Sequence, residues 1–213
     1  MSYKKPMLVI FEGIDGTGKT TLMEAFKTAL HDDGATTKQV RAIGEGPIGG
    51  MLRGLLMDRQ HDLDDHVRFK IFTTAIRDCY ENHILPAIKN TDVIVMDRNE
   101  LSTLAYQGFE YIDYMVQHLQ PSIDKVRQYI DIHTVYLTAS KSTLQRRASD
   151  KANKQENDLL DDFAAQHQAK LLARYDQALK ILPEVIRLDT TDKSPEELVS
   201  HLMNILLPSK ARH

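Results

Sequence analysis

MLVIFEGIDGTGKT, residues 7–20, is the stretch that decides the fold. Its first five residues, Met7–Phe11, form an apolar run that is typical of a buried strand, and a glycine-rich segment follows at once. From Lys19 to about His31 the apolar residues recur at helical spacing. A buried strand, a glycine-rich turn and a helix in direct succession predict the first unit of an α/β fold.

The glycine-rich turn fits the phosphate-binding pattern G-x-x-x-x-G-K-[ST], with fixed positions at Gly13, Gly18, Lys19 and Thr20. Glycines let successive backbone N–H groups point into a concave loop, and the helix N-terminus adds partial positive charge. The lysine can reach the β- and γ-phosphates, and the threonine hydroxyl can ligate Mg²⁺. The context disfavours a turn without a ligand, but the motif alone does not separate a kinase from a GTPase, a transporter ATPase or a switch protein.

Asp15 occupies a variable position of this loop. Its carboxylate would be repelled by the donor phosphates, so we expect it to face a hydroxyl group of a second substrate. A local hydrogen bond that merely shapes the loop is the alternative.

Short apolar runs alternate with longer amphipathic ones along the rest of the chain. This alternation predicts parallel strands joined by helices, in a sheet covered on both faces. Further strands are expected at 37–43, 93–96, 134–138 and 184–188, a Gly/Pro-rich turn at 44–50, and helices at about 48–57, 64–89 and 194–207. The last helix should start with Ser194 as its N-cap and Pro195 in its first turn.

The composition is that of an ordinary globular protein: 213 residues, 42% apolar and 27% charged. These values exclude intrinsic disorder and a disulfide scaffold. The net charge of −3 gives no bulk attraction to nucleic acid, and no run approaches the ~20 apolar residues of a membrane span. The lone cysteine, Cys79, suits a reducing compartment. We therefore predict a soluble, cytoplasmic protein, a single domain over residues 1–213, with no nucleic-acid or membrane partner.

A second motif, DRNELSTLAYQG, follows the predicted strand at 93–96. Asp97, at the carboxyl end of a core strand, can hold Mg²⁺ through water, and Arg98 offers a planar fork for a phosphate group. Ser102 and Tyr106 are four residues apart and share a helix face, with Gln107 adjacent. Their hydroxyl and amide groups are candidates for contacts with a base or a sugar.

GIDGTGKTT and DRNELSTLAYQG together resemble the thymidylate kinase family of P-loop nucleoside-monophosphate kinases. The segments Leu52–Leu56 and Phe72–Ile88 are also similar to that family, whereas similarity is weak after about Gly108. The resemblance implies a three-layer α/β fold with a five-stranded parallel sheet, helices on both faces and a small lid. It implies transfer of the γ-phosphoryl group of ATP to dTMP, giving dTDP and ADP, with Mg²⁺ as cofactor. Homodimer formation is expected by family analogy only.

Site roles follow from the same resemblance, position by position. The ATP-binding residues would be Gly13, Ile14, Asp15, Gly16, Thr17, Gly18, Lys19, Thr20 and Thr21, and the metal-binding residues Thr20 and Asp97. The acceptor-binding residues would be Asp15, Arg53, Phe72, Arg77, Arg98, Ser102, Tyr106 and Gln107, with Phe72 stacked on the base. We assign catalytic roles to Lys19, Asp15, Arg98, Arg147, Lys151 and Lys154.

A basic segment suggests a lid at about 141–158. Arg147, Lys151 and Lys154 fall at helical spacing and could form one face that closes on phosphates and excludes water. The family carries lid arginines where this chain reads DKANKQE, which leaves Lys151 or Lys154 as the transition-state cation. A solvated charged helix is the alternative.

The chain departs from the family pattern near the base. The family places an arginine four residues after the stacking phenylalanine, where this chain has Ile76. Arg77 lies about 140° around a helix from Phe72, against about 40° for Ile76. The family loop Arg-Glu-Pro-Gly-Gly is also altered to GEGPIGG at 44–50, and Arg41 is a candidate substitute for its arginine.

These departures keep other functions open. A broad-specificity or non-thymine deoxynucleoside-monophosphate kinase is the main alternative. A deoxynucleoside kinase is disfavoured because its neutral acceptor would not need Arg53 and Arg98. A non-catalytic nucleotide-binding switch is the last alternative.

Overall fold

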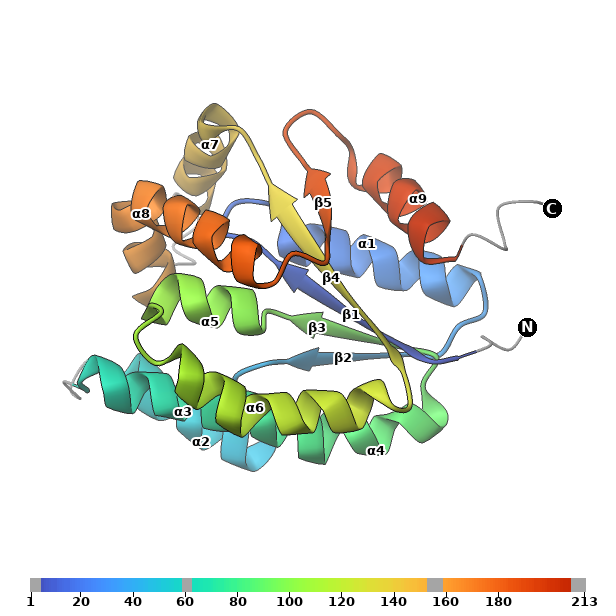
Figure 1. Cartoon of the computed structure of the whole chain (residues 1–213). Coiled ribbons are helices and arrows are strands. Elements are labelled where there is room, and N and C mark those ends of the chain that lie inside the picture. Colours follow the sequence, from blue (N-terminus) through green and yellow to red (C-terminus); the bar gives the residue numbers. More distant parts are fainter. Residues whose placement is uncertain (1–4, 59–62, 153–158, 208–213) are drawn as a thin grey trace.

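A computed structural model describes residues 5–58, 63–152 and 159–207, and contains a parallel sheet of five strands in the order β2-β3-β1-β4-β5 (Figure 1). The predicted five-stranded parallel α/β fold is confirmed. The elements are β1 (Met7–Glu12), α1 (Lys19–Asp32), β2 (Thr37–Arg41), α2 (Gly46–Met57), α3 (Asp65–Cys79), a π-helical turn (Tyr80–Ile84), α4 (Leu85–Ala87), a 3-10 turn (Ile88–Asn90), β3 (Val93–Asp97), α5 (Glu100–Gln107), α6 (Ile112–Arg127), β4 (Asp131–Thr138), α7 (Lys141–Ala152), α8 (Leu159–Ile181), β5 (Val185–Asp189) and α9 (Pro195–Leu206).

Strand β1 lies at the centre of the sheet and is buried along its whole length. Successive side chains point to opposite faces. Leu8 and Ile10 therefore join one apolar cluster, while Val9 and Phe11 join the other. This explains why the strand is a continuous apolar run rather than an alternating one.

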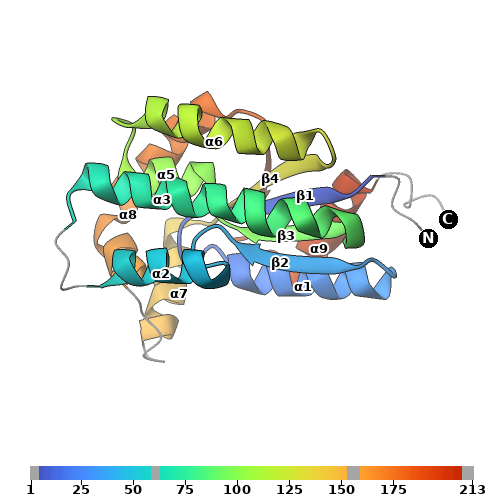
Figure 2. The same cartoon turned by 90° about the horizontal axis from the view of Figure 1, so that it is seen from below.

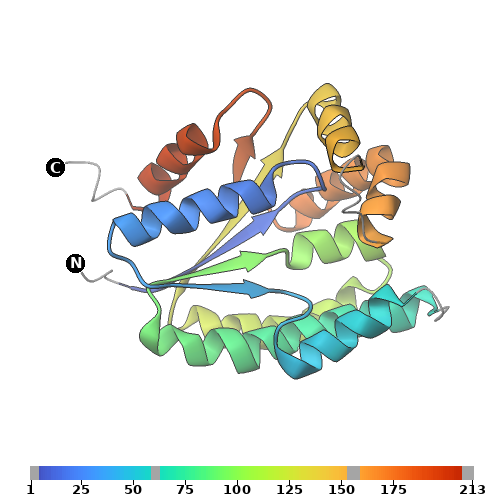
Figure 3. The same cartoon turned by 180° about the vertical axis from the view of Figure 1, so that it is seen from behind.

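Helices cover both faces of the sheet (Figures 1 and 2). One layer consists of α1 and α9, which pack on each other and supply residues such as Phe26 and Leu202 to the core on that face. The other face is covered by α3, α6, α5 and part of α8, and α2 packs against α3. Seen from behind, α1 and α9 lie on the side of the sheet opposite α3 and α6 (Figure 3).

Several element boundaries differ from the sequence-based expectation. Strand β4 starts at Asp131 rather than at residue 134, because residues 131–136 pair with β1. Helix α2 starts at Gly46, inside the expected turn, with Pro47 in its first turn where no intrahelical N–H bond is needed. The expected helix at 64–89 is interrupted by the π-helical turn, in which the N–H of Leu85 donates to the carbonyl of Tyr80, just before Pro86.

The last helix begins as predicted. The Ser194 side chain accepts from the N–H of Glu197, and the Glu197 side chain accepts from the N–H of Ser194, forming a capping box.

The carboxyl ends of the parallel strands face α5, α7 and α8 (Figure 1). Ligands of open α/β sheets bind at this edge. Within the described ranges, no helix has the length and apolar character that crossing a membrane requires.

Candidate active site

A cavity of about 350 Å³ opens at the carboxyl edge of the sheet. Its walls come from the loop before α1, the ends of β2 and β3, and helices α2, α3 and α5. The lining residues are Asp15, Gly16, Gly18, Lys19, Thr20, Arg41, Ala42, Ile43, Arg53, Phe72, Asp97, Arg98, Asn99, Ser102, Thr103 and Tyr106. The two sequence motifs, more than 70 residues apart, therefore share one cavity.

The glycine-rich loop has the backbone that its sequence predicts. Gly13 and Gly18 have φ values of 136° and 85°, in the left-handed region that favours glycine. A Cβ atom on Gly13 would lie 2.6 Å from the carbonyl oxygen of Leu137 in β4. The loop thus passes so close to the sheet that position 13 has room for glycine alone.

Lys19 lies at the base of the loop, with its side chain only 8% exposed. Its Nζ donates to the carbonyl oxygens of Gly13 at 2.8 Å and Ile14 at 3.1 Å, and lies 3.7 Å from Asp15 Oδ1. Burial, with repulsion from Arg98, lowers the pKa of Lys19 to about 8. A phosphate group in the loop would restore favourable electrostatics for this ammonium group.

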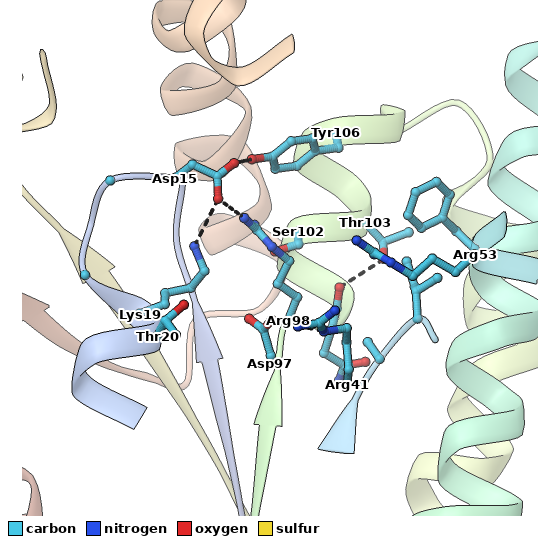
Figure 4. Close-up of a pocket in the computed structure, with 16 residues that line it drawn as sticks. Asp15, Lys19, Thr20, Arg41, Arg53, Asp97, Arg98, Ser102, Thr103 and Tyr106 are labelled. Atoms are coloured by element: carbon cyan, nitrogen blue, oxygen red, sulfur yellow. Dashed lines mark hydrogen bonds and ion pairs between the residues drawn. The ribbon is translucent and has the colours of Figure 1, made fainter. Parts of the chain in front are cut away.

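Asp15 points toward Arg98 and Tyr106 of the second motif and also lies near Lys19 of its own loop (Figure 4). Its Oδ1 accepts from Arg98 Nη2 at 2.5 Å, and its Oδ2 accepts from the hydroxyl of Tyr106 at 3.1 Å. The side chain therefore joins the two motifs.

The two terminal nitrogens of the Arg98 guanidinium group contact different kinds of oxygen. Its Nη1 donates to three protein oxygens: Gly13 O at 3.1 Å, Ser102 Oγ at 3.2 Å and Tyr175 Oη at 3.4 Å. Its Nη2 donates to Asp15. The residue also has a φ of 65°, which is uncommon outside glycine and asparagine. The strand-to-helix turn is thus strained at the residue that carries the guanidinium group.

Glu12, at the end of β1, is a buried carboxylate that the sequence analysis did not single out. It accepts from the backbone N–H groups of Asn99 at 2.8 Å and Ser102 at 3.2 Å, and from the Ser102 hydroxyl. Burial raises the pKa of Glu12, while Ser102 and the charge of Arg98 oppose this shift. Glu12 fixes the first turn of α5 against β1. In the sequence Glu12 is only the polar residue that ends an apolar run, so its contact with α5 could not be predicted.

The part of the cavity beyond Arg98 from the glycine-rich loop contains Phe72, Arg53 and Arg41. Phe72 is 5% exposed and projects from α3, whereas Arg41 is more open and lies 3.7 Å from Asp97. Arg41 and Arg53 lie on the opposite side of Arg98 from Lys19 (Figure 4). Thr103, which the sequence analysis did not assign, is buried beside them and donates to the carbonyl of Asn99.

Ile76 is fully buried in the core below Phe72, and Arg77 is exposed at the end of α3. Arg77 and Gln107 are absent from the cavity walls, as are Gly13, Ile14, Thr17 and Thr21 of the expected ATP-binding set. Of the expected acceptor residues, Asp15, Arg53, Phe72, Arg98, Ser102 and Tyr106 are brought together.

Thr20 and Asp97 fit a hard divalent cation. Both line the cavity, and they supply a hydroxyl and a carboxylate oxygen, the ligand types that Mg²⁺ prefers with nucleotide phosphates. The described residues contain no cluster of three or more His, Cys, Asp or Glu side chains that could hold a metal by themselves.

Arg147 projects from α7 onto the back of the glycine-rich loop. Its Nη1 donates to the carbonyl of Gly16 at 3.0 Å, and its Nη2 donates to the carbonyl of Thr190 at 3.0 Å. The Thr190 hydroxyl in turn donates to Thr17 O at 2.9 Å, so α7, β5 and the loop are connected. Lys151 lies in α7 with its side chain outside the described part, and Lys154 falls outside the described residues.

Comparison with known proteins agrees with this geometry. Residues 11–201 match the family model of thymidylate kinase. The thymidylate kinase of Chlorobaculum parvum is 26% identical over 209 residues, covering 94% of this chain and 95% of the relative. That of Chlorobium limicola is 31% identical over 151 residues, covering 68% and 67%.

Among solved structures, the thymidylate kinase of Candida albicans, described as having broad substrate specificity, superposes with a TM-score of 0.68. It is 19% identical, and the match covers 97% of this chain and 93% of the other, so this likeness supports the fold. Because the family model matches residues 11–201, which is most of its length, the chain belongs to the thymidylate kinase family.

Proposed function

We propose that this protein transfers the γ-phosphoryl group of ATP to the 5′-phosphate of dTMP, giving dTDP and ADP. The observation that carries the proposal is the shared cavity. A phosphate-binding loop forms one end, and a guanidinium group, a second arginine and a buried aromatic ring form the other. Two anionic nucleotides bound end to end would meet near Lys19 and Arg98.

The donor half uses the loop of residues 13–21. Backbone N–H groups and Lys19 would hold the β- and γ-phosphates, and Lys19 would exchange its contacts with loop carbonyls for phosphate oxygens. Thr20 and Asp97 would hold Mg²⁺, which when bound neutralises charge on the donor phosphates. Phosphoryl transfer depends mainly on such positioning and charge neutralisation.

The acceptor half uses Arg98, Arg53 and Phe72. A phosphate oxygen of dTMP would replace the Asp15 carboxylate on Arg98 Nη2, and Asp15 would turn to a hydroxyl of the acceptor sugar. Phe72 would stack on the base, with Ser102 and Tyr106 at the adjoining wall. The carboxylate that now pairs with Arg98 thus occupies the place of an anionic substrate group.

For the lid, we propose that the segment at about 141–158 closes over the phosphates. Lys151 or Lys154 would supply the additional positive charge. Arg147 would act from its present position, since it links α7 to the loop through Gly16.

One observation favours a second function, a kinase with broader base specificity. Ile76, where the family places a base-reading arginine, is fully buried and apolar. A site that lacks a hydrogen bond to a base edge discriminates less against related bases.

We also propose a cytoplasmic homodimer. Exposed apolar side chains on α2 and α6, Ile48, Met51 and Val116, support a subunit interface on those helices. Sedimentation of the protein at several concentrations tests this part of the proposal.

A coupled assay with ATP, Mg²⁺ and each of dTMP, dUMP, dCMP, dGMP and dAMP tests the function. Preference for dTMP in kcat/KM supports a thymidylate kinase, and comparable values support the broader enzyme. Turnover of thymidine but not dTMP would indicate a deoxynucleoside kinase, and nucleotide binding without acceptor-dependent turnover would indicate a switch.

A further inference from the structure

Tyr175 of α8 places a buried hydroxyl group beside the guanidinium of Arg98. Its side chain is fully buried, and its ring packs on that of Tyr136 with centroids 5.3 Å apart. Its Oη lies 2.8 Å from Ser102 Oγ and 3.4 Å from Arg98 Nη1. A polar group this deeply buried is normally placed by its hydrogen bonds, and both partners here belong to the second motif.

The donors and acceptors in this group can be assigned from their chemistry. Ser102 has one hydroxyl proton, which it donates to the carboxylate of Glu12. Its oxygen then has only lone pairs left, so Tyr175 donates its proton to Ser102. Burial raises the pKa of Tyr175, which keeps the phenol protonated at neutral pH. The result is a directed chain from Tyr175 through Ser102 to Glu12.

This chain leaves the lone pairs of Tyr175 Oη for Arg98. Tyr175 Oη, Gly13 O and Ser102 Oγ are thus the three oxygens that accept from Arg98 Nη1. The opposite nitrogen, Nη2, faces the carboxylate of Asp15. One edge of the guanidinium is thus held by neutral protein oxygens, and the other faces an anion that a substrate phosphate can replace.

We propose that Tyr175 is a positioning residue for the acceptor phosphate: its hydroxyl, directly and through Ser102, orients the guanidinium of Arg98 so that Nη2 meets that phosphate. The proposal rests on the proposed function, because it requires a monophosphate acceptor. It also changes the role of Ser102, from a wall of the base pocket to a link in the chain that holds Arg98.

The proposal predicts an effect confined to ligands that carry a phosphate. Tyr175→Phe removes the hydroxyl and keeps the ring on Tyr136. We expect Kd for dTMP to rise about tenfold, the range for losing a hydrogen bond to a charged group. The inhibition constant of thymidine, which has no phosphate, and KM for ATP should stay within about twofold.

Two further variants make the test specific. Tyr136→Phe is the matched control, since it removes a neighbouring phenol hydroxyl on which the charges of Asp176, Arg187 and Glu12 act rather than that of Arg98, and should leave all these constants unchanged. Ser102→Ala breaks the chain at its next link and should reproduce the phosphate-selective loss. In an Arg98→Ala background, Tyr175→Phe should cause no additional loss of dTMP affinity.

The outcomes separate this proposal from the proposed function. Equal loss of dTMP and thymidine affinity, or an unchanged Kd for dTMP in both Tyr175→Phe and Ser102→Ala, would overturn the positioning role. If Tyr175→Phe does not fold, as judged by its Tm, Ser102→Ala decides alone. Failure of the wild-type protein to bind or turn over dTMP would instead overturn the proposed function.

Discussion

The two ends of the cavity are built in different ways. The donor end is one continuous segment, residues 13–20, whose backbone forms the site. The acceptor end gathers side chains from α2, α3, β3 and α5, and its central arginine is held by oxygens from Gly13 of the loop, Ser102 of α5 and Tyr175 of α8. A site made of backbone depends on local conformation, whereas a site made of converging side chains depends on the packing of distant elements.

Loss of the loop ammonium group should give the largest effect. Lys19→Ala removes the loop ammonium group that we propose to bind the donor phosphates, and we expect kcat to fall by about 10³-fold or more. The measurement is the steady-state rate with saturating ATP and dTMP, together with the Tm of the variant.

Lys27→Ala serves as the control for this variant. Lys27 lies on the same helix, away from the cavity, where it pairs with Glu24. If Lys19→Ala retained wild-type kcat, the donor end would have to be placed elsewhere.

Removal of the acceptor guanidinium should be the next largest effect and should fall on the other substrate. Arg98→Ala removes the partly buried guanidinium that now pairs with Asp15 and that we propose to bind the acceptor phosphate, and truncating one partner of such a hydrogen-bonded charge pair costs about 2–5 kcal/mol. We expect kcat/KM for dTMP to fall by about 100-fold or more, while KM for ATP changes little. Arg77→Ala, an exposed arginine on α3, is the matched control. A loss shared equally by both substrates would contradict the division of the cavity into two ends.

A single methyl group should damage the donor end through its backbone. Gly13→Ala places a Cβ 2.6 Å from Leu137 O at a φ of 136°, and we expect a loss of about 3 kcal/mol in the free energy of unfolding. Gly50→Ala is the control, because a Cβ there meets nothing within 4 Å. Denaturant titration compares the two; equal midpoints would show that the loop can move away from β4.

The same division explains what could be predicted from the sequence. The strand, the loop and the helix of residues 7–31 follow from local pattern, and so does the capping box at Ser194. Asp15, Arg98 and Tyr106 were expected at one site, and they lie together because strand order brings β1 next to β3.

Residues whose roles depend on packing were not predicted. Glu12 reads as the end of an apolar run and Tyr175 as one more aromatic residue in a long helix. They meet Ser102 only because α5 packs between β1 and α8. Arg77 was assigned to the acceptor site from the resemblance, although the helical spacing put it on another face than Phe72; in the structure Ile76 is turned into the core and Arg77 is exposed.

The smallest predicted effect concerns a second carboxylate, which lies beside Asn99 of the cavity wall. Glu100, in the first turn of α5, is half-buried; burial and the neighbouring charge of Glu12 raise its pKa to about 7. In the unfolded chain it would ionise near its ordinary value of about 4.3. Below that value both states are protonated. Between the two values the unfolded state releases its proton first, so the free energy of unfolding falls as pH rises, until both states are ionised above about 7.

Glu100→Gln cannot ionise and keeps an oxygen for the Asn99 amide group. We therefore expect it to be more stable than the wild type by about 2 kcal/mol at pH 8 and equal to it at about pH 3. Glu184→Gln, at an exposed position before β5, should show no such pH-dependent gain. Urea titrations of the three proteins at both pH values provide the measurement. If Glu100→Gln were stabilised equally at both pH values, the shape of the side chain rather than its charge would limit the packing of α5. The acceptor end would then resemble the donor end, because both would depend on how closely the backbone fits.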